Sequence, residues 1–254
     1  MILLKKNLME QPAKAINSKK ESFLQNNIGF FFIVVLFFTF LGFYPSYFAY
    51  FPAFKDFSWV YHFHAFFGTL WILMLITQAF LIRKKNYNLH RKIGKASYFV
   101  IPFLLFSFFL VAKAMYFKSI NINHLSEADA LAGLSRTGLP DILYLSILYS
   151  LGMIYKRRTS WHIRFLTCTG LMILGPGFGR FAFRNFSPEV AGPSLGILFL
   201  GIPLIWLIID IIKKRSPIPL LVFIAISMTA GYMNGAGHSA WWQTFAKWFA
   251  GTFF

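Results

Sequence analysis

The stretch WVYHFHAFFGTLWILMLITQAFLIRKKNYNLHRKIGKAS, residues 59–97, decides how this chain folds. Its first part, 59–82, is an uncharged apolar run, and about 20 such residues are enough to cross a bilayer as a helix. The part that follows carries six Lys or Arg residues and no acid. A membrane span that ends in a basic turn is therefore the unit from which we expect the rest of the chain to be built.

The composition extends this interpretation to the whole chain. Hydrophobic residues make up 57% of the 254 residues, 33 are Phe, and the mean hydropathy is +0.59. We predict an all-α fold, a polytopic transmembrane helical bundle with about seven spans, between a polar tail (1–28) and an outer amphipathic segment (237–254). The predicted spans, within 29–236, are 29–52, 59–82, 97–117, 140–155, 163–183, 194–212 and 217–236.

The charges predict the orientation. With the N-terminus in the cytoplasm, the inner tail and loops hold 18 Lys or Arg residues against 3 acids, and the outer side holds 7 against 5. This asymmetry is what the positive-inside rule requires, so we expect a multi-pass protein of the bacterial inner membrane with its C-terminus outside. The net charge of +17 lies between the spans, which argues against a nucleic-acid interface.

Two histidines mark a first candidate site. His90 and His162 begin predicted spans at the inner surface, and two imidazoles on facing helices can bind a haem iron axially. Arg91, Lys92 and Arg164 are then available to neutralise the haem propionates. Alternatively, both histidines add to a basic surface that contacts anionic lipid.

A second candidate site lies near the outer surface. Helical spacing places His64 on the inward face of its span with Tyr61, Trp71 and Gln78, and places His62 about 200° away, at the lipid interface. The alternatives for this outer cluster are a second haem, a zinc or copper site at His64, His238 and His124, a pocket for an anionic or quinone-like ligand, or no site at all. Its members are Tyr61, His64, Lys113, Asp141, Arg180, Arg184, Asn234 and His238, and the ligand pocket would be lined by Tyr61, Trp71, Gln78, Arg180 and Asn234.

Two further features are polar or helix-breaking within apolar sequence. GPGFG, 175–179, predicts a break or a Pro kink in its span, and Asp210 is expected to pair with Lys213 or Lys214 at i+3 or i+4. The single Cys168 excludes a disulfide framework. Motifs of soluble hydrolases and nucleotide-binding enzymes are absent, and no catalytic residue is assigned.

The chain also resembles known families. The series HFHAFFGTLWILMLITQAFLIR, NLHRKIGK, LPDILYLSILYSLGMIYKRR and WHIRFLTCTGLMILGPGFGR, within about residues 59–184, is similar to a bacterial membrane family, domain of unknown function 2306. NLHRKIG also resembles a region of the cytochrome b561 group. That resemblance implies two b haems between four histidines on four consecutive helices.

By position, His64, His90 and His162 match three of those four histidines. The span 140–155 contains no histidine, so the implied outer haem needs His238 or His124 as its ligand. We therefore expect a haem b electron carrier that uses His90 and His162 and reacts with a quinone or a membrane redox partner. The alternative is a non-redox accessory subunit, receptor or small-ligand-binding protein with an outer pocket.

Overall fold

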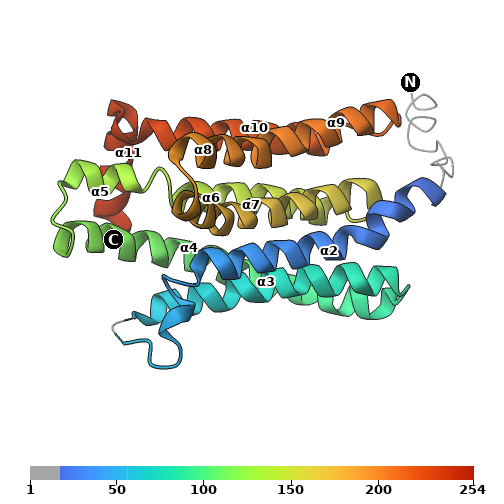
Figure 1. Cartoon of the computed structure of the whole chain (residues 1–254), viewed down its shortest axis with the longest axis horizontal. Coiled ribbons are helices and arrows are strands. Elements are labelled where there is room, and N and C mark those ends of the chain that lie inside the picture. The colour runs from blue at the N-terminus through green and yellow to red at the C-terminus, as the bar shows by residue number, and fades with distance from the viewer. Residues whose placement is uncertain (1–17, 56) are drawn as a thin grey trace, which may run out of the picture.

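The structure, a computed structural model, describes residues 18–55 and 57–254 (Figure 1). Within these ranges it is helical, with no strand, as the sequence predicts. The first described helix begins at Ser18, and the candidate membrane span within it is Asn26–Phe43. Residues 1–17, most of the predicted tail 1–28, lie outside the described ranges. The helices are α2 Ser18–Phe43, α3 Trp59–Arg83, α4 Tyr87–Asn121, α5 Glu127–Gly133, α6 Leu139–Ile154, α7 Thr159–Asn185, α8 Pro188–Gly196, α9 Ile202–Ile212, α10 Ile218–Gly235 and α11 Ala240–Phe253.

Short polar residues set where the helices begin. Ser58 accepts a hydrogen bond from the backbone N–H of Val60 at the start of α3, and Asn86 accepts one from Leu89 at the start of α4. Gly138 precedes α6 with φ +84°, a conformation that favours glycine. Ser58 and Asn86 satisfy backbone donors that the first helical turn leaves unpaired.

Five helices pack in a closed cycle, in the order α2, α3, α4, α6 and α7, with α7 returning to α2. Trp71, Leu75, Leu104 and Leu148 are among the buried side chains of the core that these helices share. Helices α8, α9 and α10 cover α7 from the other side, and α11 lies across one end of the bundle (Figure 1). Because α7 has neighbours on several sides, it is the most enclosed helix of the bundle.

The contact between α2 and α7 depends on glycines of the GPGFG stretch. A Cβ at Gly177 would lie 2.7 Å from the Cα of Thr39, and one at Gly42 would overlap the carbonyl of Gly177. A Cβ at Gly175 would overlap the ring of Phe199, in the π-helical turn Ile197–Gly201 between α8 and α9. The predicted break at 175–179 is therefore wrong: α7 is continuous, and its glycines allow neighbouring elements to approach closely.

Five helical segments are long and apolar enough to cross a membrane, counted over residues 18–55 and 57–254: Asn26–Phe43, Trp59–Arg83, Tyr87–Asn121, Pro188–Ile212 and Ile218–His238. The predicted fourth span appears as the shorter apolar helix α6, of 16 residues. The predicted fifth span, in α7, is 27 residues long but is not among the five. The arginines and glycines of α7 lower its mean hydropathy. A helix with such residues is tolerated in a bilayer when other helices surround it.

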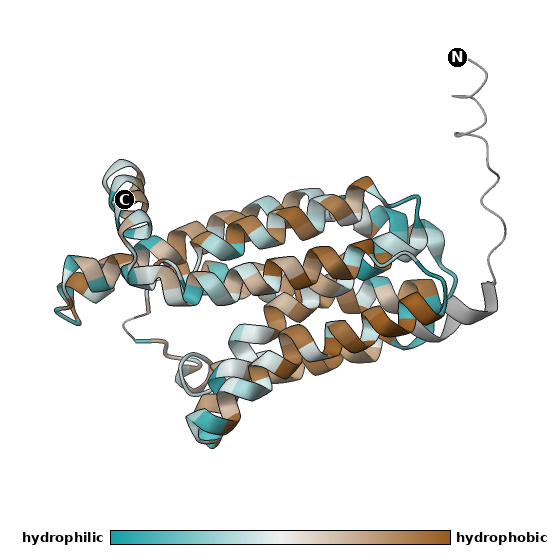
Figure 2. Ribbon diagram, turned by 90° about the horizontal axis from the view of Figure 1, so that it is seen from above, coloured by the Kyte–Doolittle hydropathy of each residue, from teal (hydrophilic) through white to brown (hydrophobic). Residues whose placement is uncertain are grey.

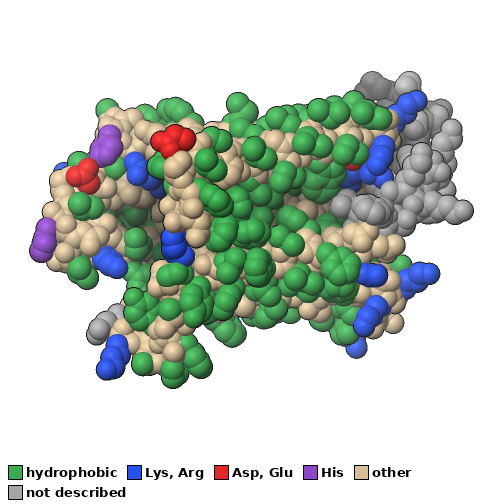
Figure 3. Space-filling model, in the orientation of Figure 1, with side chains coloured by type: hydrophobic (Ala, Val, Ile, Leu, Met, Phe, Trp, Pro, Cys, Tyr) green, Lys and Arg blue, Asp and Glu red, His purple; other side chains and the backbone are tan. Residues whose placement is uncertain are grey.

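The two ends of the bundle differ in charge. We call one the basic end, where the turns 84–86, 155–158 and 213–217 lie; among the side chains described there, Asp210 is the only acidic one. The other, the α11 end, carries acids, histidines and cations together. Figure 2 shows hydrophobic residues along the middle of the bundle, and Figure 3 shows Lys and Arg at both ends, with the His side chains in view at the α11 end. This distribution is compatible with a multi-pass membrane protein.

Candidate functional site

His162 lies in the first turns of α7 at the basic end, with one ring nitrogen fixed. Its Nδ1 is 2.7 Å from the carbonyl oxygen of Gly152 in α6. Since a carbonyl only accepts, Nδ1 carries the proton and donates it. Nε2 therefore keeps its lone pair, which is the usual state of a histidine that binds a metal.

His90 lies at the start of α4, at the same end of the bundle as His162. Its Nδ1 is buried without a hydrogen-bond partner among the described residues. Gln78 of α3 donates from Nε2 to the carbonyl oxygen of His90 at 3.0 Å, and the Oε1 of Gln78 is also buried without a partner. His90 and Gln78 are therefore in contact, and each has one buried polar atom without a hydrogen-bond partner among the described residues.

Further polar groups continue this cluster into the bundle. Ser97 donates to the carbonyl of Gly94 at 2.6 Å, so the hydroxyl of Tyr149 is the donor in the 2.7 Å bond between Tyr149 and Ser97. The ring of Trp71 meets that of Tyr149 edge to face at 5.7 Å, and its Nε1 has no acceptor in the described chain. We name His90, His162, Gln78, Ser97, Tyr149 and Trp71 the inner cluster. Each buried unpaired polar atom costs about 1–3 kcal/mol, so this cluster is suited to a bound polar or metal-containing group.

The two histidines predicted as haem ligands lie near the starts of α4 and α7, two helices that both pack against α6. His162 has a free Nε2 and a fixed Nδ1–H, whereas neither the Nδ1 of His90 nor the Oε1 of Gln78 has a hydrogen-bond partner among the described residues. Arg91 and Lys92 are exposed at the same end, and Arg91 donates to Asn88 at 2.6 Å.

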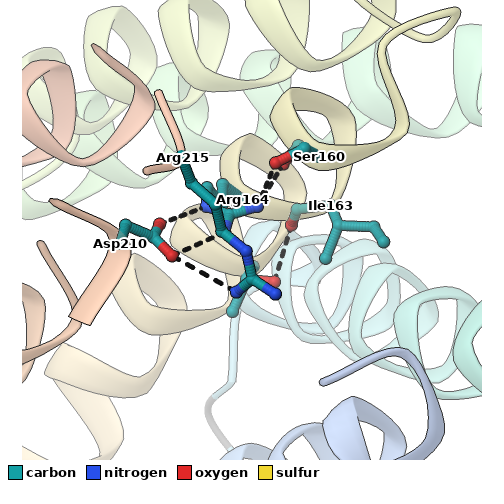
Figure 4. Close-up of polar contacts among 6 residues, drawn as sticks. Ser160, Ile163, Arg164, Asp210 and Arg215 are labelled. Carbon is teal, nitrogen blue, oxygen red and sulfur yellow. Dashed lines mark hydrogen bonds and ion pairs between the residues drawn. The ribbon is translucent and has the colours of Figure 1, made fainter. Parts of the chain in front are cut away.

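Arg164 and Asp210 form a separate buried site (Figure 4). Arg164 donates from Nε and Nη2 to the two carboxylate oxygens of Asp210, at 2.5 and 2.7 Å, and from Nη1 to Ser160. The side chains are 1% and 0% exposed, and Arg215 adds a third contact at 3.4 Å. The predicted pairing of Asp210 with Lys213 or Lys214 is therefore wrong. Arg164 is held by Asp210 and Ser160 rather than placed to meet a haem propionate.

At the α11 end, the structure brings together part of the predicted outer cluster. Ser107 donates to the carbonyl of Leu104, so His64 is the donor, from Nδ1, in its 2.9 Å bond to Ser107. Arg180 interacts electrostatically with His64, and its guanidinium lies 4.2 Å from the ring centre of Phe43. Arg184, one turn further along α7, is 3.5 Å from the carbonyl of Gly42.

The other predicted members have different partners. Asp141 accepts from the backbone of Gly138 at 3.0 Å, Lys113 is 3.5 Å from the carbonyl of Phe253, and the hydroxyl of Tyr61 meets the sulfur of Met115 at 3.8 Å. Asn234 is exposed, so it does not share a pocket with the buried Trp71. The predicted ligand pocket therefore divides, with Trp71 and Gln78 in the inner cluster and Arg180 beside His64.

The histidines do not assemble as a metal site. His238 is exposed and lies 3.7 Å from Asp129, and His124 is exposed in the loop before α5. Within the part of the chain that the structure describes, no three His, Cys, Asp or Glu residues could hold a metal ion, so the predicted site at His64, His238 and His124 is wrong. His62, predicted at the lipid interface, is instead half-buried and bonds the hydroxyl of Tyr47 at 2.7 Å.

Comparison with family models, with curated proteins and with solved structures finds no match to this chain. The function is therefore argued from the geometry.

Two residues of the inner cluster, Ser97 and Tyr149, were not predicted as site residues. Ser97 and Gly94 lie on one face of α4, three residues apart, and Tyr149 and Gly152 do so on α6. Small and hydroxyl residues at this spacing inside an apolar span mark the face that packs against other helices. The sequence contains this pattern, but only the fold shows that Tyr149 contacts both Ser97 and Trp71 and that Gly152 contacts His162.

Proposed function

We propose that this chain is a seven-span protein of the bacterial inner membrane that binds haem b through His90 and His162 and carries electrons to or from a quinone or a membrane partner. The observation that carries the proposal is the pair of imidazoles at the basic end, near the starts of α4 and α7. His162 has its Nδ1–H on Gly152 and its Nε2 free, and His90 has a buried Nδ1 beside the unpaired Oε1 of Gln78.

The topology is part of the proposal. Helices α2, α3, α4, α6, α7, the segment from α8 to α9, and α10 run alternately in opposite directions between the two ends (Figure 1). Seven crossings place the basic end in the cytoplasm by the positive-inside rule, and place α11 outside. Helix α6 then crosses with thinned lipid beside it, and α7 crosses enclosed by protein.

Each residue of the inner cluster has a distinct task in this proposal. His90 and His162 would hold the iron, and a bound haem would supply the electron transfer. Gly152 orients the His162 imidazole by accepting a hydrogen bond from its Nδ1–H, and Gln78 fixes the backbone of His90 by donating to its carbonyl oxygen. The exposed Arg91 and Lys92 add positive charge at the edge of the site, which stabilises propionate groups there.

The test is an optical spectrum of the detergent-purified protein before and after dithionite, with a pyridine haemochrome assay and metal analysis of the same sample. We expect a b-type α-band that His90→Ala and His162→Ala both abolish. His62→Ala is the matched control, because His62 is a half-buried histidine outside the inner cluster. A folded, colourless and metal-free protein would refute the proposal.

A second candidate function is an accessory or ligand-binding role at the α11 end. It is favoured by the grouping of His64, Arg180 and Arg184 with no acidic partner among the described side chains. Such a site would bind an anionic ligand or partner. Mass spectrometry of molecules that copurify with the wild type, His64→Ala and Arg180→Ala proteins tests it, and an identical profile in all three would exclude this site.

A further inference from the structure

A groove lies between α6, α10 and α11, away from both histidine sites. Its larger part has a volume of about 420 Å³, and its lining is apolar or aromatic apart from two hydroxyl residues, Ser146 and Thr229. A second, more open depression lies on the surface of α6 from Ser146 past Ser150 to Leu151. Ser146 lines both regions, and we refer to the two together as the groove.

The groove opens where the bilayer would lie. Leu143, on its lining, is 57% exposed, although it is an apolar residue of an apolar helix. Helix α11 covers one end of the groove with the buried Trp242, and presents Trp241 and Trp248 to the outside. Exposed tryptophans on an amphipathic helix are typical of the membrane–water interface. The covered end of the groove is therefore at the interface, and the rest extends into the hydrocarbon layer.

The length and lining of the groove match a hydrocarbon chain. The 13 residues from Leu139 to Leu151 span about 18 Å along α6, and one leaflet of the hydrocarbon core is about 15 Å deep. Helix α6 itself is about 24 Å long, shorter than the core of about 30 Å, so lipid must adapt beside it.

A cation lies near the covered end of the groove. Arg136 is exposed, three residues before Leu139, and no side chain in the described ranges pairs with it. A guanidinium binds phosphate with paired hydrogen bonds. We propose that the groove binds one phospholipid, with an acyl chain along α6 and its phosphate at Arg136. This site does not depend on haem binding.

Groove-filling variants test the acyl-chain contact. The full-length protein is delipidated, reconstituted in vesicles of phosphatidylethanolamine and phosphatidylglycerol, and released into mild detergent for native mass spectrometry. We expect the wild type to retain one phospholipid per chain, and Thr229→Phe and Ser146→Phe to reduce retention by about tenfold or more, the equivalent of 1.4 kcal/mol. Thr77→Phe is the matched control, since Thr77 is an exposed Thr of α3 outside the groove.

The phosphate contact is tested separately with Arg136→Gln. We expect this variant to keep a bound phospholipid but to lose its preference for the anionic phosphatidylglycerol, while Arg157→Gln at the basic end changes neither. Thr229 is exposed, so Thr229→Phe preserves the test if Ser146→Phe fails to fold. The proposal is overturned if the wild type retains no phospholipid, if filling the groove leaves retention unchanged, or if Ser146→Phe instead dissociates a dimer.

Discussion

Replacing Asp210 by Ala should be among the most destabilising single changes in this protein. Asp210 is 0% exposed and accepts two hydrogen bonds from Arg164, which is 1% exposed and also stacks on Trp206 at 5.8 Å. Without the carboxylate, the buried guanidinium keeps its charge and loses its counter-ion. Removing one partner of a buried ion pair typically costs about 3–5 kcal/mol, so we expect Asp210→Ala to lower the free energy of unfolding by that amount.

The measurement is unfolding in mixed detergent micelles, followed by circular dichroism. Arg164→Met combined with Asp210→Leu removes both charges and should recover most of the loss, because an apolar pair of similar volume needs no counter-ion. Lys247→Ala serves as a control, since its pair with Glu127 at 3.5 Å is exposed on both sides and should contribute less than about 1 kcal/mol. An Asp210→Ala protein as stable as the control, or a double variant as unstable as Asp210→Ala, would show that the charge pair is not what holds α9 to α7.

Three further changes test other parts of the structure. Gly177→Ala should destabilise the fold by about 1–3 kcal/mol, because its Cβ would lie 2.7 Å from the Cα of Thr39, whereas Gly179→Ala, whose Cβ would make ordinary 3.7 Å contacts, should be nearly neutral in the same unfolding assay. Trp71→Phe removes an unpaired buried donor and should change stability by less than about 1 kcal/mol; a loss above 2 kcal/mol would mean that a bound molecule accepts from Trp71. Gln78→Leu should lower haem occupancy by about 10- to 100-fold in titrations followed by absorbance, and unchanged occupancy would remove Gln78 as the residue that orients a ligand.

The sequence predicted the helical, membrane-compatible architecture because hydropathy and span length act locally along the chain. Helical spacing also placed Trp71 on the inward face of α3, where it is buried, although Tyr61 and Gln78 of the same predicted face are only half-buried. The partner of Asp210 could not be predicted this way, because Arg164 lies 46 residues earlier, on another helix. Local spacing predicted Lys213 or Lys214 as the partner. A buried carboxylate pairs preferentially with a guanidinium, because the guanidinium donates two parallel hydrogen bonds.

The outer cluster shows the same limit. Span ends that share a side of the membrane need not share a pocket, and His64 and His238 end in different surroundings, one between helices and one exposed. The GPGFG stretch was misread because glycine and proline break helices in isolation. Because glycine has no side chain, α2 packs closely against Gly177 and the ring of Phe199 packs closely against Gly175. This packing offsets the low helical propensity of the glycines.

The glycine contact between α2 and α7 also bears on the order in which the protein is made. Gly42 and Gly177 are 135 positions apart (177 − 42), so at 5–20 residues per second the ribosome needs roughly 7–27 s to pass from one to the other. During that interval α2 is already synthesised while the surface it will pack against does not yet exist. The flank of α2 around Gly42 must therefore rest against lipid or an insertion factor until α7 emerges, and a side chain larger than hydrogen there would interfere with assembly as well as with the finished fold.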